Sequence, residues 1–325
     1  MSEIELKRIL CPVDFSEHSA KALRLAGAVA EAFGAEVVVL HAQQIELPIY
    51  FTVAQTETLE AQFRQIQGDA RKYLENYVDQ HFLARAKRSV VWKEGDPVTE
   101  ILAAGKDFQA GLVVMGTRGR SGFTRLRLGS VMESVLRGAE MPVLSVGPRL
   151  TSRAAVGPIR RILCPVDLRV DDRQTCNYAA LFAEKTGGEL NVLHVLEETS
   201  AASSSDESAR QKLCEWILAT VRERCTVKES IRRGNPSEQI VKEAQSCAAD
   251  LVVVGAYPRK TFEASLFGTT TEALVRVAPC PVLTIVRKRS PIMAERKELT
   301  EHLHSALRAF GSTGLHGCSC CFVKF

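Results

Sequence analysis

The sequence predicts a duplicated α/β fold, two tandem open five-stranded parallel-sheet sandwiches with helices on both faces of each sheet. Three observations predict it. The segment Arg8–Asp14 recurs letter for letter as Arg161–Asp167. Within each copy, buried-type apolar runs alternate with segments of helical periodicity, which is typical of parallel strands joined by helical crossovers. The chain has 325 residues, enough for two domains of about 150 residues each.

The repeat also locates the domains. Val39–His41 matches Val192–His194 at the same offset of 153, but Gly95–Pro97 matches Gly234–Pro236 at 139. The second copy therefore lacks fourteen residues between its second strand and this turn. A period this long indicates duplication of a whole domain, not a solenoid. We expect a first domain over residues 1–148, a linker over 149–158, a second domain over 159–288 and a C-terminal tail over 289–325.

The elements of the first copy follow from apolar patterning and from capping residues. Residues 8–13 form a continuous apolar run, as expected for a strand buried on both faces. Ser16 can cap the helix that follows, and Gly34 can end it. Gly95-Asp-Pro97 can open a further helix. The remaining predicted elements are strands over 36–41, 87–92, 112–115 and 142–146, and helices over 56–84, from Pro97 to about Gly105, and from near Gly129.

Composition and charge exclude several classes of protein. Hydrophobic residues make up 46% and charged residues 25% of the chain, as in an ordinary globular protein. No apolar run approaches the ~18 residues of a membrane helix, and the acidic first residues predict no secretory signal. We therefore expect reduced cysteines and a cytoplasmic location. Residues 287–325 carry the whole net charge of +4, and a neutral body argues against nucleic-acid binding.

A glycine-rich segment after the fourth predicted strand gives the sharpest functional signal. Gly116-Thr-Arg-Gly119 is followed, nine residues later, by Gly129-Ser130. A glycine lets the backbone approach a ligand, and a helix that begins at Gly129 offers free N–H groups to an anion. The alternative is a surface loop with turn glycines and solvated charges. Four arginines suit a polyphosphate, and these are Arg118, Arg120, Arg125 and Arg127.

This segment resembles that of the universal stress protein family, whose nucleotide-binding members carry Gly-x2-Gly-x9-Gly-Ser/Thr. The resemblance covers about residues 7–286 and applies to both copies. It implies an adenine nucleotide α-hydrolase-like, Rossmann-like sheet with strand order 3-2-1-4-5 in each domain. The first and fourth strands are then neighbours where the winding direction reverses, which is where open α/β sheets bind ligands.

The resemblance also implies roles for individual residues. Asp14 corresponds to the family's acid near adenosine, and the main chain of Ala42 would read the adenine edge. Gly129, Ser130 and Val131 would hold the phosphates. The alternative for Asp14 is an acid favoured by the dipole of the first helix. The predicted nucleotide-binding residues are Pro12, Val13, Asp14, Ala42, Met115, Gly116, Arg118, Gly119, Arg120, Arg125, Arg127, Gly129, Ser130 and Val131.

The second copy predicts a weaker, degenerate site. Pro258 stands where the first copy has Gly119, and proline lacks an N–H and cannot adopt the positive φ open to glycine. Only Arg259 and Lys260 replace the four arginines. We therefore expect one strong nucleotide site per chain. The matching residues of the second copy are Asp167, Gly255, Gly268 and Thr269.

The predicted function is that of an ATP-binding regulatory protein of the stress response, with slow or no hydrolysis and with or without Mg²⁺. The sequence carries no Walker, zinc-protease or nucleophile-elbow motif, so we assign no catalytic residue and no metal site. Two alternatives stay open, an interaction or chaperone-like module with a vestigial pocket and a weak ATPase. A regulatory protein is the expected partner, and DNA and membranes are not.

The fifth strands and the tail give two further expectations. Strands ending near Val146 and Val286 would be exposed apolar edges, so we expect them to pair as an internal pseudo-dimer, with homo-oligomers left open. Residues 293–310 can form an amphipathic helix that docks on the body or binds a partner. Cys318, Cys320 and Cys321 follow it, either as incidental residues of a disordered end or as metal ligands or reactive thiols.

Overall fold

A computed structural model describes residues 4–44, 68–119, 128–147, 158–197, 205–256 and 269–286. The chain divides into two compact units, Met1–Arg287 and Lys288–Phe325. The second unit lies outside the described residues, and so do the predicted helix over 293–310 and the tail cysteines. Within the described ranges, no helix combines the length and the apolar character needed to cross a bilayer.

The first half alternates strands and helices as predicted. The helix after β1 begins at its N-cap Ser16, whose Oγ accepts the Ser19 N–H at 3.1 Å, and it ends at Gly34 with a φ of 66°. A helix over residues 68–81 stops short of the predicted end at Ala84. The labelled elements are β1 (Arg8–Pro12), α1 (Glu17–Phe33), β2 (Glu36–Gln43), β3 (Arg88–Glu94), α3 (Pro97–Asp107), β4 (Leu112–Gly116), α4 (Ser130–Gly138) and β5 (Val143–Val146).

The second half repeats this pattern with a different connection between its second and third strands. Two short helices, α6 and α7, join β7 to β8, where the first copy has the longer segment that includes the helix over 68–81. The elements are β6 (Arg161–Val166), α5 (Asp172–Thr186), β7 (Glu189–Leu196), α6 (Asp206–Trp216), α7 (Ala219–Arg224), β8 (Thr226–Arg233), α8 (Pro236–Ser246), β9 (Leu251–Ala256), α9 (Thr269–Val277) and β10 (Val282–Val286).

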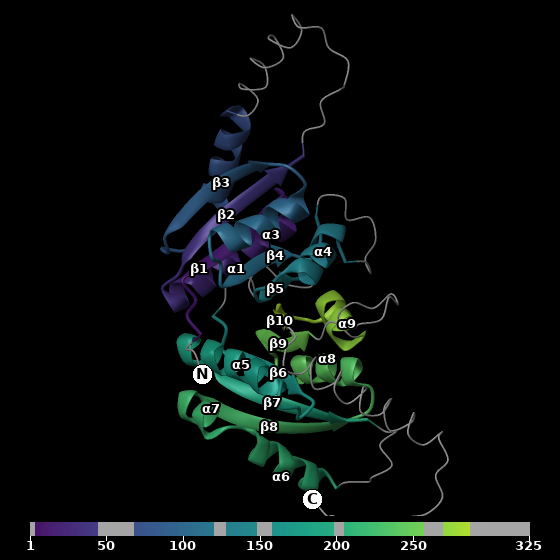
Figure 1. The fold of residues 1–325 in the computed structure, drawn as a ribbon. Coiled ribbons are helices and arrows are strands. Elements are labelled where there is room, and N and C mark those ends of the chain that lie inside the picture. The colour runs from purple at the N-terminus through teal and green to yellow at the C-terminus, as the bar shows by residue number, and fades with distance from the viewer. Residues whose placement is uncertain are drawn as a thin grey trace, which may run out of the picture. The chain divides into compact units, whose positions relative to one another are not determined.

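The described strands form one sheet in the order β3-β2-β1-β4-β5-β10-β9-β6-β7-β8 (Figure 1). Within each half the pairing is parallel and the order is 3-2-1-4-5, as the resemblance implied. The strands β5 and β10 pair antiparallel, with Leu144 opposite Leu283, and Ser145 Oγ donates to the Val282 carbonyl oxygen at 3.0 Å. The apolar fifth strands therefore lie in the middle of a sheet and not at exposed edges.

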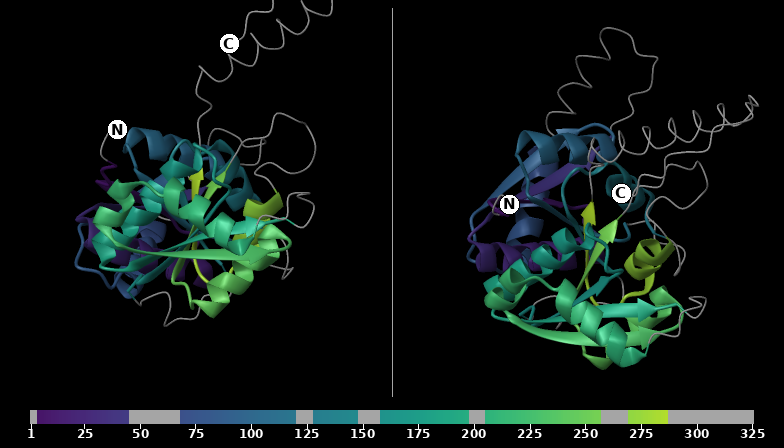
Figure 2. Two further views of the ribbon diagram at one scale, coloured as in Figure 1. Left: turned by 90° about the horizontal axis from the view of Figure 1, so that it is seen from below. Right: turned by 60° about the horizontal axis from the view of Figure 1, so that its bottom comes forward.

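Side chains that alternate along the strands pack into two cores, one on each face of the sheet. Ile9 and Cys11 join the core beneath α1, α5 and the helix over 68–81, whereas Leu10 joins the core beneath α3, α4, α8 and α9. Helices lie on both faces of the sheet (Figure 2). Burial raises the pKa of Cys11. Cys11 and Cys164 are fully buried in the cores, in agreement with the expected role of small core residues.

A polar cluster distinguishes the second half on the α8 face. Glu243 is 8% exposed, and its carboxylate accepts hydrogen bonds from Asn191 Nδ2 at 2.8 Å, from Ser230 Oγ at 3.1 Å and from Arg232 Nε. The first half has Ala104 at the position of Glu243. Burial alone would raise the pKa of Glu243, but the hydrogen bonds from Arg232, Asn191 and Ser230 together lower it. The cluster is thus built around an ionised carboxylate.

Glu243→Gln should lower the free energy of unfolding by about 1–2 kcal/mol at neutral pH, because the charged acceptor is lost. A lowered native pKa stabilises the fold above the ordinary glutamate pKa, and this contribution disappears as the pH falls through the native value. The difference between wild type and variant should therefore vanish in acid. Urea unfolding across the pH range measures this difference in unfolding free energy. Glu238→Gln, at an exposed position of the same helix, is the control. A difference independent of pH would contradict this account.

Candidate functional site

The carboxyl ends of β1 and β4, which are neighbours in the sheet, lead into a cavity of about 180 Å³. This is the crevice predicted from the strand order. Arg120, Arg125 and Arg127 lie outside the described residues. All the other predicted nucleotide-binding residues line the cavity, namely Pro12, Val13, Asp14, Ala42, Met115, Gly116, Arg118, Gly119, Gly129, Ser130 and Val131.

Further lining residues were missed by sequence reasoning. Thr117 lies inside the glycine motif itself, and Ser19 follows Ser16 by three residues at the start of α1. Both positions contained a usable signal, because a polar residue beside a phosphate motif or in the first turn of a helix can contact a ligand. The others are apolar residues or a helix-start proline that only the fold brings to the site. The missed residues are Ser19, Leu40, Pro97, Ile101, Thr117 and Met132.

Asp14 is held in a fixed orientation by the turn that precedes α1. Its Oδ1 accepts hydrogen bonds from Ser16 N at 3.1 Å and from Ser16 Oγ at 2.6 Å. The Asp14 N–H donates to Ser19 Oγ at 3.4 Å, and Ser19 Oγ lies 2.9 Å from the Tyr77 hydroxyl. The carboxylate therefore organises the start of α1 and lines the cavity at the same time.

The residue after Asp14 adopts an uncommon backbone conformation in both halves. Phe15 has a φ of 64° and Leu168, its counterpart, a φ of 57°, which is rare for residues other than glycine. The Phe15 ring packs against His41 at 4.4 Å between centroids. His41 Nδ1 donates to the Val13 carbonyl oxygen at 2.7 Å. His41 and Phe15 thus fix the end of β1 where the chain turns into the cavity.

Three motif glycines lie where the chain packs closely. A Cβ on Gly116 would lie 2.9 Å from the Cβ of His18. A Cβ on Gly119 would lie 2.7 Å from Asp14 Oδ2, and a Cβ on Gly129 would lie 3.2 Å from the Thr117 carbonyl oxygen. The expectation that Gly119 serves through a positive φ is wrong, since the described glycines with positive φ are others. The Asp14 carboxylate is what excludes a side chain at this position.

The first turn of α4 places the start of a helix at the cavity. Gly129 is the N-cap and has no side chain with which to cap the helix. The N–H groups of the first helical residues have no partners within a helix and carry its positive dipole end. Ser130, Val131 and Met132, in this turn, line the cavity. By contrast, α1 is capped by the Ser16 side chain.

A buried hydroxyl adds to the polarity of the cavity. Thr117 is 2% exposed, and among the described residues its Oγ1 has no hydrogen-bond partner. Such a buried hydroxyl is costly unless a ligand or water satisfies it. Burial, together with the nearby charges of Lys21 and Arg118, lowers the pKa of His18, which lies in the first turn of α1 and does not line the cavity. Arg118 is the cation among the described lining residues.

Comparison with known proteins assigns the chain to a family. The sequence model described as "Universal stress protein family" matches residues 5–147 and again 158–286. The chain belongs to the universal stress protein family. It is a tandem member, since each half matches separately.

Relatives of this universal stress protein include single-domain and longer proteins. A universal stress protein of Methanocaldococcus jannaschii is 30% identical over 141 residues, which are 43% of this chain and 81% of the relative. One of Mycobacterium tuberculosis is 28% identical over 233 residues, 68% of this chain and 75% of the relative. The crystal structure of a universal stress protein from Archaeoglobus fulgidus has a TM-score of 0.65 at 24% identity, covering 86% of this chain and 98% of that one. This likeness supports the fold.

In this universal stress protein the second half differs at the corresponding strand ends. Asp172 occupies the position of Ser19, is 5% exposed and accepts the Asp167 N–H at 2.9 Å. Asp167, the counterpart of Asp14, forms an ion pair with Arg169 at 2.7 Å. Ala256 replaces Thr117, so the buried hydroxyl is absent there. Gly255 is the last residue but one of β9, which ends at Ala256, and Thr269 begins α9, whereas Pro258 and Gly268 lie outside the described residues.

Proposed function

We propose that this universal stress protein binds ATP or a related adenine nucleotide in its first half and acts as a nucleotide-dependent regulatory protein of the stress response. One observation carries the proposal. The cavity brings Asp14, the glycine-rich turn and the uncapped start of α4 to the carboxyl ends of β1 and β4. Open α/β sheets bind their ligands at this place, and helix N-termini bind phosphates.

The lining residues divide into an apolar part and a polar part that suit the two ends of a nucleotide. Val13, Leu40 and Ile101 offer an apolar surface to a base, and the main chain of Ala42 is proposed to read its edge. The first-turn N–H groups of α4 and Arg118 face the phosphates in this arrangement. The buried Thr117 hydroxyl has no hydrogen-bond partner among the described residues. This supports a polar ligand, because such a ligand would supply the missing hydrogen bond. Arg120, Arg125 and Arg127 are proposed to complete the phosphate site.

We propose slow or no hydrolysis. Among the described residues that line the cavity, Asp14 is the single carboxylate and there is no histidine. Oδ1 of Asp14 already accepts two hydrogen bonds from Ser16, so the group is engaged in holding the turn. A general base must instead be poised to take a proton from the attacking water. Mg²⁺, if it accompanies ATP, would be bound largely through the phosphates.

The assembly and the compartment are also proposals. The antiparallel pairing of β5 with β10 supports an internal pseudo-dimer of the two halves. A homo-oligomer and a complex with a regulatory protein are further proposals. We propose the cytoplasm as the compartment. The seven cysteines within the described ranges are all free thiols, which suits a reducing environment.

Arg118→Gln should weaken ATP binding about tenfold and adenosine binding by less than about twofold, because a charge-assisted contact to a phosphate is lost. Calorimetric titration of each ligand measures both affinities. Arg137→Gln is the matched control, since Arg137 lies on α4, pairs with Glu133 at 3.0 Å and does not line the cavity. Equal weakening of ATP and adenosine would mean that Arg118 only supports the turn. An unmodified chain that binds neither ligand would reject the proposed function and favour a vestigial pocket.

A further inference from the structure

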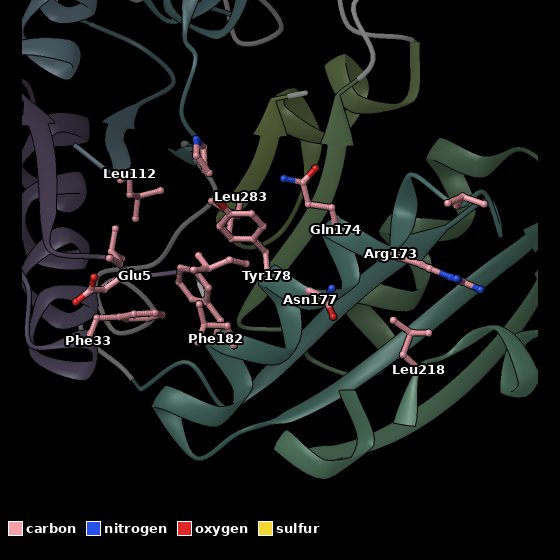
Figure 3. A pocket seen from close by; sticks show the side chains of 16 residues that line it. Glu5, Phe33, Leu112, Arg173, Gln174, Asn177, Tyr178, Phe182, Leu218 and Leu283 are labelled. Atoms are coloured by element: carbon pink, nitrogen blue, oxygen red, sulfur yellow. The ribbon is translucent and has the colours of Figure 1, made fainter. Parts of the chain in front are cut away.

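A second and larger cavity, of about 630 Å³, lies on the opposite face of the sheet from the nucleotide cavity. The first half contributes Phe33 and Leu112 to it, and the second half contributes Phe182 and Leu283 (Figure 3). The rings of Phe33 and Phe182 lie 4.8 Å apart between centroids. No residue of the glycine motif lines this cavity. Its volume falls within the roughly 300–1,000 Å³ typical of small-molecule sites.

One stripe of α5 forms a wall of this cavity and changes character along the helix. The positions recur at helical spacing, so they share a face. The first two turns present polar side chains and the later turns present apolar ones. Arg173 and Phe182, at the ends of the stripe, are nine positions apart, a length of about 13 Å along the axis of an α-helix. The stripe consists of Arg173, Gln174, Asn177, Tyr178, Leu181 and Phe182.

The polar end of the cavity favours an anion. The Nε atom of Arg173 is buried and has no hydrogen-bond partner among the described residues. Arg173 lies in the first turn of α5, where the helix dipole is positive. The neighbouring Asp172 carboxylate accepts the main-chain N–H groups of Asp167 and Arg169. Burial raises the pKa of Tyr178, so its hydroxyl stays protonated and can donate.

The other end of the cavity is apolar. In Figure 3, Phe33 and Leu112 lie away from Arg173, with Tyr178 and Phe182 between them. The acid at this end, Glu5, forms an ion pair with Lys7 at 2.9 Å. A ligand that fits must therefore combine a negative head with an apolar body.

We propose that this cavity binds a medium-chain fatty acid, with its carboxylate at Arg173 and its acyl chain along Tyr178, Phe182 and Phe33. The guanidinium Nε–H would donate to a carboxylate oxygen, which satisfies the buried nitrogen. The acyl chain would remove apolar surface of both halves from water. The site is separate from the nucleotide cavity and does not depend on the proposed nucleotide function.

Calorimetric titration of the full chain with dodecanoate, below its micelle concentration, tests the proposal. We expect one dodecanoate per chain, and about tenfold weaker binding of dodecan-1-ol, which lacks the charge. Arg173→Gln should weaken dodecanoate binding about tenfold, and Asn177→Trp, which fills the polar end, should reduce it at least as much. Lys185→Gln is the matched control, because it removes the same charge from α5 at an exposed position that does not line the cavity.

Three results would overturn the proposal. The first is no dodecanoate binding to the full chain. The second is equal affinity for dodecanoate and dodecan-1-ol, which would remove the role of the anion. The third is dodecanoate binding that neither Arg173→Gln nor Asn177→Trp changes, which would place the ligand elsewhere. Thermal unfolding of each variant, compared with wild type, verifies that the fold is intact before its affinity is interpreted.

Discussion

Ser19→Asp should weaken ATP binding more than about tenfold, because the new carboxylate adds negative charge to the cavity that we propose binds the phosphates. Ser19 lines the cavity at the ends of β1 and β4, and its Oγ accepts the Asp14 main-chain N–H at 3.4 Å. The second half already carries an acid, Asp172, at this position, where it is buried and hydrogen-bonded. The Ser19 hydroxyl also donates to the Ser16 carbonyl oxygen at 2.9 Å, which a carboxylate cannot do. Thermal unfolding of Ser19→Asp is therefore compared with wild type before its ATP affinity is interpreted.

Two comparisons make the Ser19 experiment decisive. Ser19→Ala removes the hydroxyl without adding charge and should change ATP affinity by less than about threefold. Adenosine, which has no phosphates, should bind Ser19→Asp much better than ATP does. Calorimetric titration measures each affinity. If Ser19→Asp binds ATP like the wild type, the cavity is not the nucleotide site.

Gly129→Val should weaken ATP binding about a hundredfold or more, because two or more charge-assisted contacts at the start of α4 are displaced. A Cβ at this position lies 3.2 Å from the Thr117 carbonyl oxygen, and a branched side chain adds bulk at the helix start. The matched control is Gly268→Val, the same change at the corresponding position of the second copy. It should leave the strong site unchanged. If Gly268→Val weakens ATP binding at the strong site and Gly129→Val does not, the strong site lies in the second half, which would contradict the proposal.

Much of the fold could be predicted from sequence because the signals are local and duplicated. The apolar run of β1, the Ser16 cap and the Gly34 end of α1 depend on neighbouring residues, and the structure confirms them. The strand order came from the family resemblance, since the pattern of strands and helices does not determine which strands are neighbours. The partners of Glu243 could not be predicted, because Asn191, Ser230 and Arg232 come from two different strands.

The residues of the candidate site also divide into those that the sequence predicts and those that only the folded structure reveals. The predicted residues from Pro12 to Val131 within the described ranges all line one cavity, because they follow strands that end at one edge of the sheet. Thr117 and Ser19 were missed, since their importance arises from burial and from the position of α1 over β4. The role of Gly119 was misjudged, because its constraint is the Asp14 carboxylate, more than a hundred residues away in the chain. Contacts of this kind are visible only in the folded protein.

The most direct test of the central claim, that one half of this duplicated protein carries the nucleotide site, is the number of ATP molecules bound by the unmodified chain. Calorimetric titration of nucleotide-free protein should give close to one strong site per chain. Asp172, the Asp167–Arg169 ion pair and Ala256 at the position of Thr117 all disfavour ATP in the second half. Two sites of equal affinity would contradict this account.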